Sequence, residues 1–156
     1  MIGFGRRLFT MRFALITIVI VLADQLSKQL VLKGFDLPFW LIDQQLGFQV
    51  SMNEGIAFSL PITGWGSVLL SSLLILLLLW YYYRLKPTSW QHDLVFGLVI
   101  GGAMGNLIDR LTHGAVVDFI KIFAWPTFNL ADAAIVVGFF LLILFSFRYN
   151  GKDFHF

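Results

Sequence analysis

The sequence G-G-A-M-G-N-L-I-D-R, from Gly101 to Arg110, is followed by V-V-D-F-I at 116–120 and by F-N-L-A-D-A at 128–133. Three aspartates and two asparagines gather here, whereas the flanks at 94–108 and 133–147 carry no charge and are strongly apolar. An ionisable group at bilayer depth is costly unless it is paired, hydrated or functional. The polar residues between these flanks are therefore a candidate functional site.

The composition is typical of a membrane protein. Of the 156 residues, 58% are hydrophobic and only 13% are charged, against roughly 25% charged in an ordinary soluble domain. A membrane helix needs about 20 apolar residues, so the chain has room for about four of them. We therefore expect a mainly α membrane protein with four transmembrane helices, a small extracytoplasmic β element and an interfacial loop or helix.

The apolar runs divide the chain into four expected spans within a single integral membrane domain covering residues 1–156. These spans are residues 12–33, 65–84, 91–110 and 129–148, with outside segments at 34–64 and 111–128. Alternating apolar and polar residues over 48–53 predict a short strand. Trp125 and nearby phenylalanines indicate that the second outside segment lies at the membrane interface.

The first apolar run has an alternative interpretation. Arginines precede it, and the small residues Val21 and Ala23 follow its core, as at a cleavable signal peptide. We favour a retained span, because the run continues through Leu26 and Leu30. Asp24 and Lys28 then lie one helical turn apart on the same face, where they can neutralise each other.

The basic residues predict the orientation. Seven of the 11 lysines and arginines lie beside the two termini or in the turn after residue 83: Arg6, Arg7, Arg12, Arg84, Lys86, Arg148 and Lys152. The positive-inside rule assigns that side to the cytoplasm. Both termini are then cytoplasmic, and the clustered polar residues belong to the outer half.

Several kinds of chemistry are not expected. The basic residues form no patch, so nucleic acid is not an expected partner. There is no cysteine, which excludes a thiol nucleophile, a disulfide and thiolate metal ligands. The three histidines, His92, His113 and His155, are scattered and form no H-E-x-x-H motif, so we expect neither a metal nor a cofactor.

Five motifs in order resemble those of one enzyme family. They are D-Q-L-S-K at 24–28, N-E-G-I-A-F at 53–58, and the three stretches quoted at the outset. Together they cover residues 24–133 and are similar to the motif set of the bacterial lipoprotein signal peptidases, or signal peptidase II. Each motif alone is modest evidence, but five in order on a four-span chain are specific.

The resemblance implies an aspartic endopeptidase of the bacterial inner membrane. Its substrate would be a diacylglyceryl-modified prolipoprotein, cut just before the lipidated cysteine, and its inhibitor the cyclic peptide globomycin. The implied catalytic residues are Asp118 and Asp132, and those implied in substrate binding are Asn53, Asn106, Arg110 and Asn129. Supporting roles fall to Asp24, Lys28, Gly55, Gly105 and Asp109. We expect a monomer in contact with membrane lipids.

The residues also allow other interpretations. Two neighbouring carboxylates share one proton and so offer an acid and a base for amide hydrolysis, but the spacing of Asp118 and Asp132 does not show that they meet. Intramembrane aspartates also serve proton-coupled transporters. A non-enzymatic assembly factor, in turn, could bury Asp109 beside Arg110 as a simple ion pair.

Overall fold

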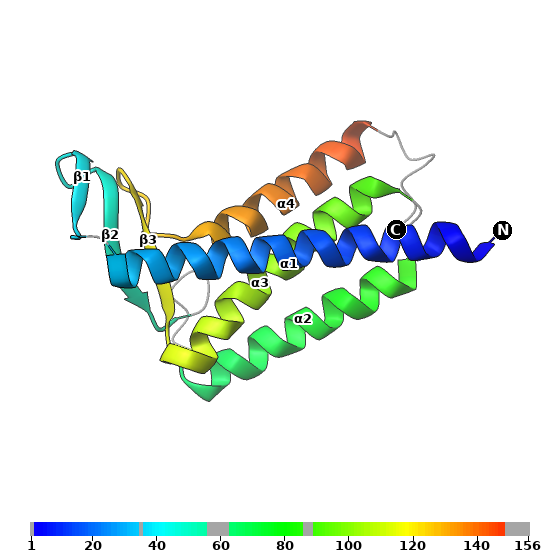
Figure 1. Cartoon of the computed structure of the whole chain (residues 1–156), viewed down its shortest axis with the longest axis horizontal. Helices are drawn as coiled ribbons and strands as arrows, with labels where there is room; N and C mark the ends of the chain where they lie inside the picture. The colour runs from blue at the N-terminus through cyan, green and yellow to red at the C-terminus, as the bar shows by residue number, and fades with distance from the viewer. Residues whose placement is uncertain (1, 35, 56–62, 86–88, 149–156) are drawn as a thin grey trace.

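Four long helices and a small sheet make up the chain in the computed structural model, which describes residues 2–34, 36–55, 63–85 and 89–148 (Figure 1). The elements are α1 (Ile2–Gly34), β1 (Phe39–Ile42), β2 (Leu46–Asn53), α2 (Trp65–Leu85), α3 (Trp90–His113), β3 (Val116–Ile122) and α4 (Leu130–Arg148). Lys86, Lys152 and the end of the N-E-G-I-A-F motif, residues 56–58, lie outside the described residues.

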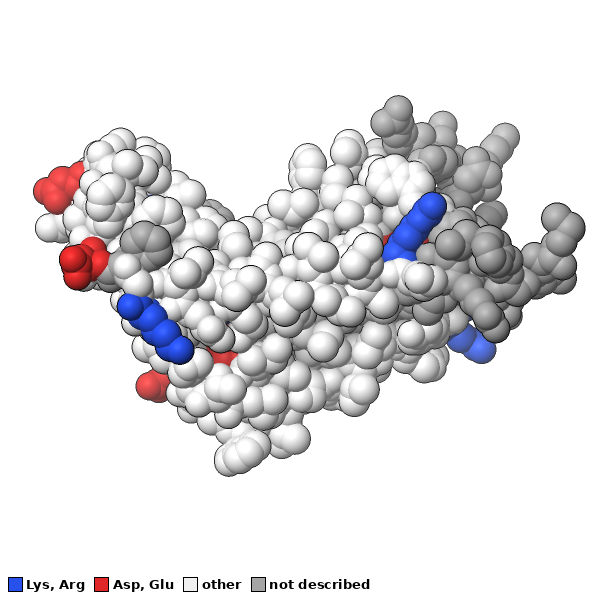
Figure 2. Space-filling model, in the orientation of Figure 1, with Lys and Arg blue, Asp and Glu red and all other residues white. Residues whose placement is uncertain are grey.

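All four helices are long and apolar enough to cross a membrane, which confirms the predicted fold class. The candidate spans are Met11–Gly34, Trp65–Arg84, Trp90–His113 and Leu130–Phe147. In hydrocarbon a helix satisfies all its backbone hydrogen bonds internally, which favours this architecture. Figure 2 shows the matching surface, where charged side chains lie toward the two ends and an uncharged zone separates them.

Helix α3 is the centre of the bundle. In its most apolar window 56% of the residues are buried, against 17–22% in the other three helices. α1, α2 and α4 all pack against it. The site residues on α3 are therefore held by neighbours on several sides, whereas the apolar outer faces of the other helices are left for lipid.

Glycines let α1 approach α3 closely. A Cβ atom added at Gly101 would lie 2.9 Å from Cβ of Ile20, and one added at Gly105 would lie 2.5 Å from Oδ2 of Asp24. Side chains at these positions would push the helices apart. The two glycines, four residues apart on one face of α3, thus allow Asp24 on α1 to lie directly against α3.

The sheet lies at one end of the bundle, away from the start of α1 and the end of α4 (Figure 1). It is antiparallel in the order β1-β2-β3. The predicted strand at 48–53 lies within β2, and the second outside segment adds β3 to the same sheet. In the β2–β3 register Ser51 pairs with Asp118, and an irregularity lies between Phe48 and Ser51.

Candidate active site

Asp118 lies on β3 and is only 2% exposed. Each of its carboxylate oxygens accepts a hydrogen bond from an asparagine. Nδ2 of Asn129 donates to Oδ1 at 2.7 Å, and Nδ2 of Asn53, at the end of β2, donates to Oδ2 at 3.1 Å. The side chain is therefore fixed from two sides by neutral donors rather than by a cation.

Asp132 lies in the first turn of α4 and is partly exposed. Nδ2 of Asn106, on α3, donates to its Oδ1 at 2.7 Å, and the backbone N–H of Asn129 points to its Oδ2 at 3.4 Å. In return, the backbone N–H of Asp132 donates to Oδ1 of Asn129 at 2.9 Å. This reciprocal pair caps the start of α4 and sets the direction of the Asp132 carboxylate.

Asn129 joins the two aspartates. Its side-chain oxygen caps the backbone of Asp132, while its side-chain nitrogen donates to Asp118. The same nitrogen lies 3.1 Å from Oδ1 of Asn106 and 3.3 Å from the backbone oxygen of Val117. Because Asn129 is fully buried, these hydrogen bonds are shielded from water, and they fix the positions of β3, α3 and α4 relative to one another.

The electrostatics of Asp118 depart from those of a surface carboxyl. Burial, and then the negative charge of Asp132, raise the pKa of Asp118 to about 6 from 3.8. The hydrogen bonds from Asn53 and Asn129 and the charge of Lys28 oppose this rise. The negative charge of Asp132 thus disfavours ionisation of Asp118, as expected of two carboxylates at one site.

A buried ion cluster lies beneath the site. Lys28 Nζ lies 2.8 Å from Oδ2 of Asp24 and 2.8 Å from Oδ2 of Asp109. The same nitrogen donates to Oδ1 of Asn106 at 3.2 Å. This contact turns the oxygen of the Asn106 amide toward the cation and leaves its nitrogen to donate to Asp132.

The two anions of this cluster also bind backbone groups. Oδ1 of Asp24 accepts the N–H of Ala131 at 3.0 Å, in the first turn of α4. Oδ2 of Asp109 accepts the N–H of Val117 at 2.9 Å, on β3. Helix α1 is thereby tied to α4, and α3 to the strand that carries Asp118.

The alternative interpretation, in which Asp109 is buried in a simple ion pair with Arg110, differs from the structure. Asp109 pairs with Lys28, and no salt bridge joins it to Arg110 within the described residues. Consecutive residues on a helix project about 100° apart, so Asp109 faces α1 while Arg110 faces the end of β2. The prediction of a simple ion pair between Asp109 and Arg110 is therefore wrong.

Arg110 instead connects α3 to the loop after β2. Its Nη2 donates to the backbone oxygen of Gly55 at 3.1 Å, and Nη1 donates to that of Asn106 at 3.3 Å. The N–H of Gly55 is held by Oδ1 of Asn53 at 3.1 Å. Nε of Arg110 is buried without a partner among the described residues, so one donor of its guanidinium group is unsatisfied in this structure.

The sequence analysis did not single out Gln25. Its Nε2 donates to Oδ1 of Asp109 at 2.9 Å and lies 3.2 Å from the backbone oxygen of Gly105 and 3.3 Å from Oδ2 of Asp24. The only signal was its position inside the D-Q-L-S-K motif, beside Asp24. With Gln25 included, the structure brings every candidate residue into one continuous network.

Fold and site together define a class of protein, a four-helix membrane protein with two interacting carboxylates where its helices meet a small sheet. Within the described residues, no three His, Cys, Asp or Glu side chains could hold a metal ion. The family model described as Signal peptidase (SPase) II matches residues 16–148. The chain therefore belongs to the signal peptidase II family of membrane peptidases.

Relatives and solved structures agree with this assignment. The lipoprotein signal peptidase of Shewanella pealeana is 44% identical, with 92% of this chain and 89% of the relative covered. That of Shewanella amazonensis is 40% identical, with 92% and 91% covered. A solved bacterial membrane enzyme has a TM-score of 0.74 at 25% identity and covers 91% of this chain and 94% of its own.

Proposed function

We propose that this protein is an aspartic endopeptidase that removes the signal peptide from diacylglyceryl-modified prolipoproteins, cutting just before the lipidated cysteine. Asp118 and Asp132 are the catalytic pair. The observation that carries this proposal is the double contact of Asn129, which donates to Asp118 and forms the reciprocal cap with Asp132. One buried side chain thus supports both carboxylates, as a shared acid and base require.

The two carboxyl groups have different surroundings, which suggests different roles. Asp118 is nearly fully buried and its pKa is raised to about 6, so it is the better holder of the shared proton. Asp132 lies at the N-terminus of α4, where the helix dipole favours a negative charge, and it is partly exposed. Asp132 is therefore the better base for an incoming water molecule.

In this scheme the reaction begins with both groups in place. Asp132 takes a proton from water as its oxygen attacks the scissile carbonyl, and Asp118 donates its proton to the carbonyl oxygen. The tetrahedral intermediate then collapses: Asp132 gives its proton to the leaving amine, the C–N bond breaks, and Asp118 takes back a hydroxyl proton as the carbonyl re-forms. Peptide cleavage by this route uses only the two aspartates and water.

Polar groups around the pair would hold the substrate. Nε of Arg110 is buried and unpaired within the described residues, so it can donate to a peptide carbonyl or to the developing oxyanion. Asn53 and Asn106 reach the two carboxylates from opposite sides. Asp24, Lys28 and Asp109 would act more remotely, by fixing Asn106 and the start of α4.

An in vitro assay tests the activity. Purified protein is incubated with a lipid-modified prolipoprotein and with the same precursor lacking lipid, at matched concentrations in one detergent. The lipid-modified form should shorten to a product beginning at the lipidated cysteine, and the unmodified form should be cut far more slowly. Buried acyl chains add about 0.8 kcal/mol per CH₂ to binding. Equal cleavage of both forms would remove lipid recognition from the proposal.

We further propose that the protein lies in the bacterial inner membrane with both termini in the cytoplasm and the catalytic pair at the outer face. α1 begins and α4 ends at the pole opposite the sheet (Figure 1), and seven of the 11 basic residues lie near those ends or beside the turn after α2 in the sequence. The lipidated substrate would meet the site where apolar helices end. Globomycin would compete for the same surface, and the enzyme would act as a monomer.

Single cysteines test this orientation without background, because the chain contains none. Cysteine at Thr63, just before α2, should react with an impermeant maleimide on intact cells. Cysteine at Thr88, between α2 and α3, should react only after the cells are opened. The reverse pattern would place the catalytic pair on the cytoplasmic side and contradict the proposed location.

A further inference from the structure

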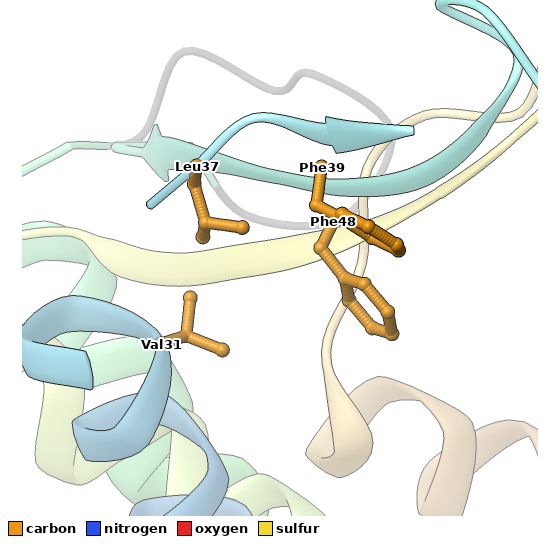
Figure 3. Close-up of a pocket in the computed structure, with 4 residues that line it drawn as sticks. All are labelled: Val31, Leu37, Phe39 and Phe48. Atoms are coloured by element: carbon orange, nitrogen blue, oxygen red, sulfur yellow. The ribbon is translucent and has the colours of Figure 1, made fainter. Parts of the chain in front are cut away.

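An apolar pocket lies between the end of α1 and the β1–β2 hairpin. Its volume is about 270 Å³, and Val31, Leu37, Phe39 and Phe48 line it without a polar surface. In Figure 3, Val31 rises from α1 toward Leu37, and the rings of Phe39 and Phe48 lie together on the other side. None of these residues takes part in the network around the two aspartates.

The pocket is adjacent to the candidate catalytic pair along the sheet. Phe48 pairs with Ile120 on β3, and two residues further along the same strand Asp118 pairs with Ser51. A strand advances 3.2–3.4 Å per residue, so Ile120 and Asp118 are about 7 Å apart along β3. The pocket also lies by the last turns of the apolar span Met11–Gly34, where hydrocarbon gives way to the outer segments.

The lining restricts what can bind. A phosphate, a sugar or a peptide backbone would lose its hydrogen bonds to water in this pocket and find no replacement. Hydrocarbon, by contrast, gains from every methylene that leaves water. Phe39 and Phe48 are 53% and 39% exposed, so apolar surface remains for a flexible chain to cover.

We propose that this pocket receives one acyl chain of the diacylglyceryl group carried by the substrate cysteine. The inference rests on the proposed function, because that lipid is attached to the residue directly after the scissile bond. The acyl chains therefore start beside Asp118 and Asp132. The pocket lies further along β3, where Phe48 pairs with Ile120. Occupation of the pocket selects long-chain substrates and holds the scissile bond in place.

Filling the pocket tests the proposal. Two lipopeptides of identical sequence are compared, one with a dipalmitoylglyceryl and one with a dibutyrylglyceryl group on the cysteine. Val31→Trp should lower kcat/KM for the dipalmitoyl substrate about tenfold, the change expected when roughly two methylenes lose their buried site. The dibutyryl substrate, whose chains are too short to fill the pocket, should be cut almost as by the wild type. Leu32→Trp is the matched control, because Leu32 is an exposed neighbour that does not line the pocket.

The outcomes separate the two proposals. An equal loss for both substrates would overturn the acyl site, because a bulk phospholipid chain in the pocket would affect both substrates alike. The same loss in Leu32→Trp would also overturn it, because Leu32 does not line the pocket. Failure of the wild type to cut either substrate would instead contradict the proposed function.

If Val31→Trp does not fold, Phe48→Ala replaces it in the same comparison. Its control is Phe123→Ala, because Phe123 is exposed and lies at the end of the sheet. Removal of the pocket wall at Phe48 should lower the preference for the dipalmitoyl substrate several-fold, and an unchanged preference would overturn the acyl site.

Discussion

Asparagine in place of either Asp118 or Asp132 is expected to abolish precursor cleavage while leaving a folded, membrane-inserted protein. An amide has nearly the same shape as a carboxyl group but can neither take nor give the proton that amide hydrolysis needs. General acid and base catalysis contribute about 10²–10⁴-fold each in well-studied enzymes, so the loss should reach at least that size. Cleavage is measured at matched amounts of purified protein, with thermal unfolding of each variant alongside.

The matched control for this pair is Asp43→Asn. Asp43 is an exposed carboxylate in the turn between β1 and β2, outside the hydrogen-bond network. Its loss removes the same charge from the same end of the protein and should leave the rate unchanged. Near-normal cleavage by Asp118→Asn or Asp132→Asn would show that the residue concerned is not catalytic.

The raised pKa of Asp118 predicts how the wild-type rate depends on pH. Asp118 holds its proton below about pH 6 and loses it above, so the rate should fall as the pH rises past that region. At low pH the rate should fall again, because the pair then holds two protons and no longer contains a base. The maximum marks the single-proton state, between the two macroscopic pKa values of the pair. A rate that rises steadily into alkaline pH would contradict Asp118 as the acid.

The second large effect is expected at Lys28, where Lys28→Met should strongly destabilise the protein. The change leaves Asp24 and Asp109 buried without the cation that now lies 2.8 Å from each. Breaking a buried ion pair by removing one partner costs about 3–5 kcal/mol. Thermal unfolding in detergent should show a large fall in the midpoint, and the yield of folded protein should fall with it.

Two further variants isolate the cause of that loss. Lys33→Met removes an exposed lysine from the last turn of the same helix and should leave stability nearly unchanged. The double variant Lys28→Met, Asp109→Asn removes one of the stranded charges and should be more stable than Lys28→Met alone. If the double variant is less stable than the wild type by the sum of the two single-variant losses, the two residues are not coupled and the ion cluster is not the reason.

The sequence predicted the helices well because each rests on a local property. An uncharged run of about 20 residues admits few structures other than a membrane helix. The pairing of Asp24 with Lys28 is also local, since i and i+4 share one helix face. Gly101 and Gly105 are likewise four residues apart on one face of α3, and α1 is the helix that packs against that face.

Features that depend on distant segments were less accessible. β3 has four consecutive buried residues at its start, so it lacks the alternation that revealed β2. The partner of Asp109 lies on another helix, and no spacing rule selects Lys28 over the adjacent Arg110. At the other pole, the hydroxyl of Tyr82 donates to Oδ1 of the buried Asp93 at 2.7 Å, and this contact between α2 and α3 left no sequence signal.

The hydrogen bond from Ala131 to Asp24 spans 107 positions and joins the first membrane helix to the last. It has a consequence for biosynthesis. A nascent chain with three inserted helices contains Lys28, Asn106 and Asp118, but it lacks both the cap of α4 and Asp132. Within the described residues, the backbone donor to the carboxylate of Asp24 comes from α4. Insertion of the final helix would therefore bring together the proposed catalytic pair and the contact between α1 and α4 in one event, and we expect no proteolytic activity from a shorter ribosome-bound chain.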